Sequence, residues 1–113
     1  MEKFNFSYDS RNDDLFVYLD GKKSKGAIEL GNFILDFDDK GDLVAIQILN
    51  ASLVLSKLLS RVIKINMIRE IRINAMNFRN MEAIQFQIVT DKGKENANIL
   101  IPHIKEKSPV LQY

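Results

Sequence analysis

Apolar and polar residues alternate with a period of two along most of this chain of 113 residues. This alternation is typical of β-strands that bury one face. It predicts strands over 4–8, 14–19, 33–37, 43–49, 70–78, 82–90 and 98–101, with 27–30 as a candidate short edge strand. The segment from Leu15 to Leu19 is apolar on both faces, so we expect it in the middle of the sheet.

The period changes after residue 52, where apolar residues recur with helical spacing. The stripe lies at i, i+3, i+4, i+7 and i+10 and consists of Leu55, Leu58, Leu59, Val62 and Ile65. It predicts one amphipathic helix over about 53–66. The preceding Asn50-Ala51-Ser52 offers side-chain oxygens to cap the first free N–H groups. A helix this short is marginal alone in water, so it must bury its stripe against the sheet.

Two hairpin turns are predicted by the same tripeptide. Asp39-Lys40-Gly41 lies in the turn Asp38–Asp42, and Asp91-Lys92-Gly93 follows a later strand. Asp bonds readily to its own backbone, and Gly adopts positive φ without steric cost.

The pattern as a whole predicts an α+β fold: an antiparallel, meander-like sheet of about seven strands with one central helix packed on it. We expect one domain over 1–113. It would consist of a ββββα part over 1–66, a three-stranded extension over 67–104 and a tail over 105–113.

Composition excludes several kinds of chemistry. The chain has no cysteine, so it has no disulfide, thiolate metal site or cysteine nucleophile. His103 is the only histidine, and no glycine-rich phosphate loop or nucleophile-elbow motif occurs. No segment has the uninterrupted apolar length of a membrane span or signal peptide. We therefore expect no catalysis, cofactor or metal, no membrane association, and a cytoplasmic location.

The densest group of carboxylates is Asp36, Asp38, Asp39 and Asp42. A calcium loop starting at Asp36 would need an oxygen ligand at position 5 and Glu at position 12. Those positions hold Lys40 and Gln47, so we interpret the acids as part of a solvated turn.

Charge is distributed unevenly along the chain. Residues 1–42 carry ten acidic and six basic side chains, whereas 43–81 carry one acidic and six basic. On the predicted helix, Lys57, Arg61 and Lys64 share the face opposite the apolar stripe. Three interpretations remain open: a solvated face, a phosphate-binding face, or a surface for an acidic protein partner.

The first half of the chain resembles the domain of unknown function 2283 family of small prokaryotic proteins. The resemblance covers about 3–55 and rests on Tyr8-Asp9, on the strand 14–19 and on the segment 36–52. Four positions depart from the family pattern: Ser10, Ala45, Gln47 and Asn50. The family has no established activity, and the resemblance implies at most an antitoxin-like or other binding partner.

One helix covers only one face of a single sheet. The segments 15–19 and 99–101 are apolar on both faces, which favours a homodimer or other homo-oligomer. We therefore expect a self-associating, non-catalytic protein-interaction module. The alternative is a nucleic-acid-associated or antitoxin-like regulatory protein that uses Lys57, Arg61 and Lys64. A third hypothesis, an enzyme or small-ligand binder, would need a deep polar pocket around His103 or the Asp36 cluster.

Overall fold

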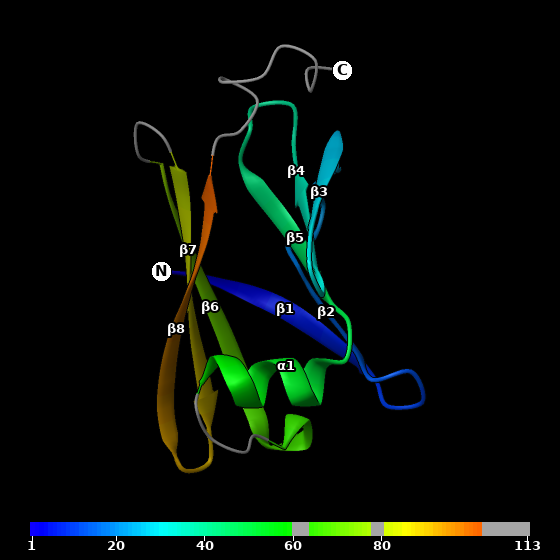
Figure 1. The fold of residues 1–113 in the computed structure, drawn as a ribbon, viewed down its shortest axis with the longest axis vertical. Helices are drawn as coiled ribbons and strands as arrows, with labels where there is room; N and C mark the ends of the chain where they lie inside the picture. Colours follow the sequence, from blue (N-terminus) through cyan, green and yellow to red (C-terminus); the bar gives the residue numbers. More distant parts are fainter. Residues whose placement is uncertain (60–63, 78–80, 103–113) are drawn as a thin grey trace.

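Residues 1–59, 64–77 and 81–102 are described by the computed structural model (Figure 1). In these ranges the chain forms eight strands, one α-helix and one short 3₁₀-helix. The elements are β1 (Glu2–Asp9), β2 (Asp14–Tyr18), β3 (Gly26–Leu30), β4 (Phe33–Phe37), β5 (Leu43–Ile48), α1 (Ala51–Leu58), η1 (Ile65–Met67), β6 (Ile68–Asn77), β7 (Met81–Thr90) and β8 (Gly93–Pro102). The α+β class is confirmed, but the count of about seven strands was too low, because residues 26–30 form a complete strand.

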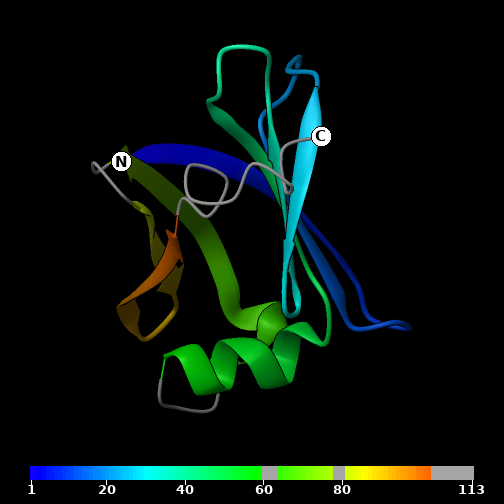
Figure 2. The same ribbon diagram turned by 45° about the horizontal axis from the view of Figure 1, so that its top comes forward.

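The strands form one antiparallel sheet in the order β3-β4-β5-β2-β1-β6-β7-β8. The predicted meander is wrong. In a meander each strand pairs with the next one in the sequence, whereas here β2 pairs with β5 and not with β3. The sheet is also curled into a half-barrel (Figure 2). β1 joins its two arms, since Asn5–Asp9 pair with β2 while Glu2–Phe4 pair with β6. We call β2–β5 the first arm and β6–β8 the second arm.

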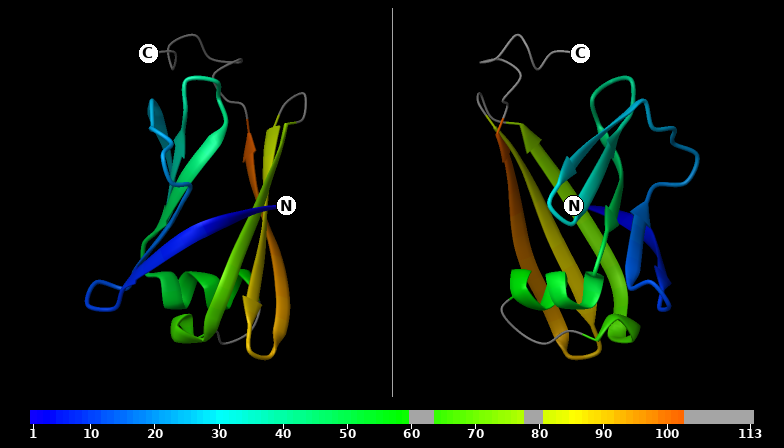
Figure 3. Two further views of the ribbon diagram at one scale, coloured as in Figure 1. Left: turned by 180° about the vertical axis from the view of Figure 1, so that it is seen from behind. Right: turned by 45° about the vertical axis from the view of Figure 1, so that its right-hand side comes forward.

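The helix is shorter than predicted. α1 ends at Leu58, and the chain is extended again at Lys64 before the turn of η1. Ile65 is buried as its place in the stripe suggested, but it lies in η1 rather than in α1. α1 lies across one end of the curled sheet, far from the β4–β5 hairpin (Figure 3). Within the described ranges, no helix has the length and apolar character needed to cross a membrane.

The start of α1 is capped by a residue distant in sequence. Asn50 occupies the N-cap position in the left-handed region, but its side chain makes no capping hydrogen bond. Asp13 caps the helix instead: its carbonyl oxygen accepts the Ala51 N–H at 2.8 Å, and its carboxylate accepts the Ser52 N–H at 3.1 Å. The prediction that Asn50 and Ser52 supply the capping oxygens was therefore wrong.

Buried side chains of both arms and α1 form one hydrophobic cluster. It includes Leu15 and Ile46 from the first arm, Leu55 from α1, and Ile84 and Phe86 from the second arm. These side chains define the inner face of the sheet. The alternate residues of each strand define the outer face, which points away from α1.

Candidate functional site

The outer face of the first arm exposes two aromatic rings on one strand. Phe16 and Tyr18 retain 41% and 36% of their accessible surface. Their cross-strand neighbours on β5 are Gln47 and Ala45, and the rings remain exposed beside them. A shallow hollow of about 430 Å³ lies around them. We call this surface the outer patch; it consists of Ser7, Phe16, Tyr18, Asp36, Ala45 and Gln47.

The outer face of the second arm is mostly polar, although it exposes Leu100. Asn74 donates a hydrogen bond to Gln85 at 3.4 Å, and Gln87 donates one to Asn96 at 3.3 Å. These hydrogen bonds link the side-chain amides of neighbouring strands from β6 to β8, and such polar side chains are compatible with exposure to water. Among the described residues, the exposed aromatic side chains are Phe16 and Tyr18 on the first arm.

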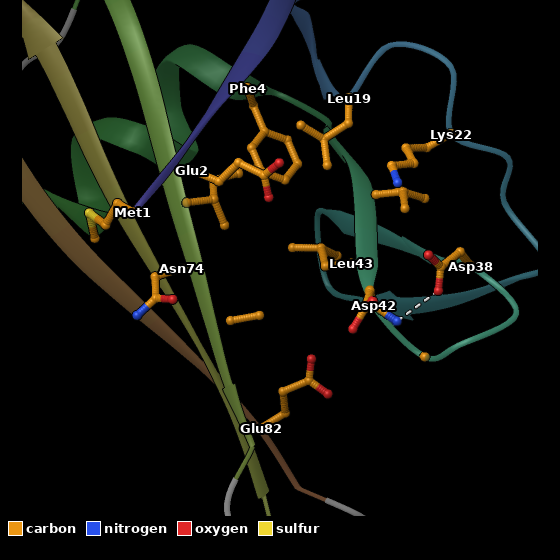
Figure 4. Close-up of a pocket in the computed structure, with 14 residues that line it drawn as sticks. Met1, Glu2, Phe4, Leu19, Lys22, Asp38, Asp42, Leu43, Asn74 and Glu82 are labelled. Carbon is orange, nitrogen blue, oxygen red and sulfur yellow. Dashed lines mark hydrogen bonds between the residues drawn. The ribbon is translucent and has the colours of Figure 1, made fainter.

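A second hollow, the end cleft, opens at the end of the half-barrel opposite α1 (Figure 4). Its volume is about 360 Å³, and Phe4, Leu19 and Leu43 contribute apolar walls. Its charged lining residues are Glu2, Lys22, Asp38, Asp42 and Glu82. Among the residues that the structure describes, no three His, Cys, Asp or Glu side chains lie close enough to hold a metal ion. The cleft is lined by Asp38 and Asp42 of the Asp36 cluster but by no residue of a helix, and His103 lies outside the described residues, so the third hypothesis stays a prediction.

The acidic residues of the Asp36 cluster, interpreted from the sequence as part of a solvated turn, lie in β4 and in the β4–β5 hairpin. The Asp38 carboxylate accepts the N–H groups of Lys40 and Asp42, each at 2.9 Å. The hydrogen bond from the Asp42 N–H is the main reason that the pKa of Asp38 lies below its usual value. Asp36 accepts the hydroxyl of Ser24 at 3.0 Å. The interpretation of this cluster as a turn agrees with these contacts.

Of the three basic residues predicted as a binding face, the two that the structure describes do not lie on one helix. Lys57 is exposed in the last turn of α1, and Lys64 is exposed in an extended segment beyond it. Arg61 lies outside the described residues, as does His103. A binding role for Lys57, Arg61 and Lys64 stays a prediction, but the shared helical face on which it rested is wrong for Lys64.

Other basic residues of the same segment have acidic partners. Arg69 binds Asp91 through two hydrogen bonds of 2.7 and 2.9 Å. Arg72 pairs with Glu70, which also lies 3.6 Å from Lys3. These pairs neutralise part of the positive charge that the composition of 43–81 indicated. They leave less of it for phosphate groups.

Tyr8, Asp13 and Ser52 form the most connected polar cluster in the first half of the chain. The Tyr8 and Ser52 hydroxyls donate to the Asp13 carboxylate at 2.6 and 2.7 Å. Desolvation raises the pKa of Asp13, but the bonds from Tyr8 and Ser52 outweigh it, so the net shift is downward. The same bond to Asp13 raises the pKa of Tyr8. Asp13 accepts the Ser52 hydroxyl while it caps α1, so we interpret the cluster as structural.

Sequence reasoning did not single out Phe16 and Tyr18 as a site. The signal was present, because the segment Leu15–Leu19 is apolar on both faces. Period-two alternation alone could not tell whether the second face is covered by another element or left open. The arrangement of the strands in space decides this, and the meander-like arrangement predicted from the sequence was wrong.

Comparison with known proteins locates similarity in the first half of the chain. Residues 5–52 match the family described as "Protein of unknown function (DUF2283)". An "Uncharacterized protein" of Methanocaldococcus jannaschii is 50% identical over 50 residues, which cover 44% of this chain and 43% of that protein. A Methanosarcina mazei protein with the printed name "Putative hypoxanthine phosphoribosyltransferase" is 40% identical over 47 residues, covering 42% of this chain and 38% of its own length.

The chain thus spans less than half the length of these two relatives. No solved structure matches it. The family match begins in β1 and ends at Ser52, the residue whose N–H is capped by Asp13. The predicted resemblance is confirmed: residues 5–52, from β1 to the start of α1, carry the sequence pattern of the DUF2283 family, whose function is unknown.

Proposed function

We propose that this chain is a non-catalytic protein-interaction module that self-associates and binds a partner polypeptide through the outer patch. The observation that carries the proposal is the exposure of Phe16 and Tyr18 side by side on β2. Burial of an aromatic ring is favourable relative to its exposure to water, and aromatic residues are enriched in protein interfaces. A polypeptide lying over both rings would bury them, and this burial would contribute favourably to the free energy of binding.

The surroundings of the rings suit a polypeptide partner. Ser7, Asp36 and Gln47 border the hollow and offer hydroxyl, carboxylate and amide groups to a partner backbone. The Tyr18 hydroxyl can donate or accept a hydrogen bond at the edge of the buried area. This arrangement of an apolar centre with a polar rim is usual for protein–protein interfaces.

Peptide display against the immobilised full chain tests the proposal. We expect enriched peptides that bind with micromolar dissociation constants. Their binding should weaken more than tenfold in the variant with Phe16→Ser and Tyr18→Ser, because both anchors are lost. Leu100→Ser is the matched control, since Leu100 is 59% exposed on the outer edge strand β8. Binding that survives the double variant, or no enrichment at all, would refute the outer patch as an interface.

A further inference from the structure

The exposed rings of the outer patch lie between carboxylates. Along the outer face of β2 the side chains are Asp14, Phe16 and Tyr18, and Asp20 follows them. Asp20 lies on the same face, because its carboxylate accepts the Asn5 amide at 3.0 Å and Asn5 is the cross-strand partner of Tyr18. The two rings are therefore flanked along the strand by an acidic residue at each end.

A third carboxylate borders the rings from the side. Tyr18 pairs with Ala45 on β5, and Ala45 pairs with Asp36 on β4. Tyr18 and Asp36 are thus two strand spacings apart, roughly 10 Å between Cα atoms. In that row only the methyl group of Ala45 lies between them, and all three residues line the hollow of about 430 Å³. The hollow therefore has an aromatic wall and a carboxylate wall.

The outer face of β1–β5 is acidic as a whole, although the chain has a net charge of +1. Its charged side chains are five carboxylates and two ammonium groups: Asp9, Asp14, Asp20, Glu29 and Asp36, with Lys3 and Lys25. Lys3 lies 3.6 Å from Glu70 of β6. Lys25, in the bend before β3, and Glu29 flank the β3 residue that pairs with Asp36, so their charges offset each other there. A cationic partner complements this face, and an anionic one is repelled by it.

We propose, as an extension that rests on the proposed function, that the outer patch binds a basic, extended segment of a partner protein. An arginine side chain of this segment lies on the rings of Phe16 and Tyr18, with its guanidinium directed to Asp36. A guanidinium stacks on aromatic faces and forms paired hydrogen bonds with a carboxylate, so one side chain suits both walls of the hollow. Asp14 and Asp20 favour further cations on either side of that arginine.

The same carboxylates disfavour other occupants. A single-stranded nucleic acid could stack bases on the rings, but its phosphates would meet carboxylates where such sites present cations. An entirely apolar segment would bury Asp36 without a partner for its charge, which costs free energy. A second copy placed with its outer patch against this one would bring like charges together, so self-association would use another surface. The charge of the face thus selects a cationic polypeptide.

Paired peptides that differ only in charge test the proposal. One probe is a fluorescein-labelled nonapeptide of alternating arginine and serine; the other has citrulline, the neutral isostere of arginine, at every arginine. By fluorescence anisotropy with the full chain, we expect a micromolar dissociation constant for the arginine peptide and binding about tenfold weaker or more for the citrulline peptide. Affinity for the arginine peptide should also fall between about 50 and 300 mM salt, because salt screens exposed charges.

Variants of the chain locate the binding. Asp36→Asn keeps an oxygen that can accept the Ser24 hydroxyl but removes the charge. It should weaken binding of the arginine peptide about three- to tenfold and leave the citrulline peptide unchanged. Asp42→Asn is the matched control, because it removes the same charge at the end cleft. Phe16→Ser with Tyr18→Ser should abolish binding of both peptides, and circular dichroism verifies that each variant is folded.

The outcomes separate the basic partner from the interface itself. Display peptides that need Phe16 and Tyr18 but contain no arginine or lysine would overturn the basic partner and leave the outer patch as an interface. Equal affinities for the arginine and citrulline peptides would do the same, as would equal losses in Asp36→Asn and Asp42→Asn. No binding peptide at all, or binding that survives the loss of both rings, would overturn the basic partner and the interface together.

Discussion

At the scale of single residues, Asp13 has the most consequential set of contacts. It adopts the left-handed region with φ of 57°, and it satisfies the first two free N–H groups of α1. Its negative charge also lies at the positive end of the helix dipole. The cap joins residues 39 positions apart, so it ties the β1–β2 hairpin to the helix.

Asp13→Asn tests this role, because Asn also tolerates the left-handed region but cannot accept both hydrogen bonds from Ser52. We expect the free energy of unfolding at pH 7 to fall by about 1–2 kcal/mol. Urea denaturation followed by circular dichroism measures it. Asp14→Asn removes the same charge one residue away and should change stability little; equal losses in both variants would contradict the cap.

The effect of this substitution depends on pH in a defined direction. The folded pKa of Asp13 lies below its usual value of 3.8, so the charged carboxylate stabilises the fold. That stabilisation is complete above the unfolded pKa and is lost as the pH falls through the folded pKa. The difference between wild type and Asp13→Asn should therefore be full at pH 7 and shrink below about pH 4.

At the scale of elements, strand alternation and turn chemistry predicted the two arms well. The Asp38–Asp42 turn and the Asp91–Gly93 turn both join strands as expected. The first half of β8 was missed, because its exposed side carries Lys94, Asn96 and Asn98 and it contributes few buried residues. Edge strands lack the strong alternation of central ones, so sequence patterns underestimate them.

The length of α1 shows why helical periodicity can mislead. Ile65 is buried and fits the stripe, yet it reaches the core from η1. An apolar stripe indicates which residues face the core. A residue outside the helix can also face the core, so the stripe does not fix where the helix ends. The cap and the order of the strands depend on contacts distant in sequence, which local patterns do not encode.

Two leucines of α1 allow the effect of truncating a buried side chain to be compared with that of truncating an exposed one. Leu55 is fully buried, whereas Leu53 is 57% exposed on the same helix. We expect Leu55→Ala to lower the free energy of unfolding by about 2–5 kcal/mol, because it leaves a cavity in the core. Leu53→Ala should change it by less than about 0.5 kcal/mol. Urea denaturation of both variants measures the contrast, and similar losses would argue against the observed packing of the helix.

At the scale of the whole molecule, the family match ends before η1, whereas the hydrophobic cluster extends into the second arm. Residues 5–52 match the family, while Ile71, Ile84 and Phe86 of the second arm share one buried cluster with Leu15 of the first. β1 continues from one arm into the other. Side chains that share a core lose their packing together, so the two arms should unfold in one step.

Two probes on different arms test this prediction. Tyr8 and Tyr18 report on the first half of the chain once the third tyrosine is removed by Tyr113→Phe, and the chain has no tryptophan. Leu100→Trp therefore adds a single reporter at an exposed position of β8. We expect tyrosine and tryptophan fluorescence to give the same urea midpoint, because neither arm retains a closed core without the other. Phe4→Ala, at the junction where β1 pairs with β6, should lower both midpoints together. Two separate midpoints would mean that residues 1–66 and 67–104 are independent folding units, contrary to the single domain predicted from the sequence.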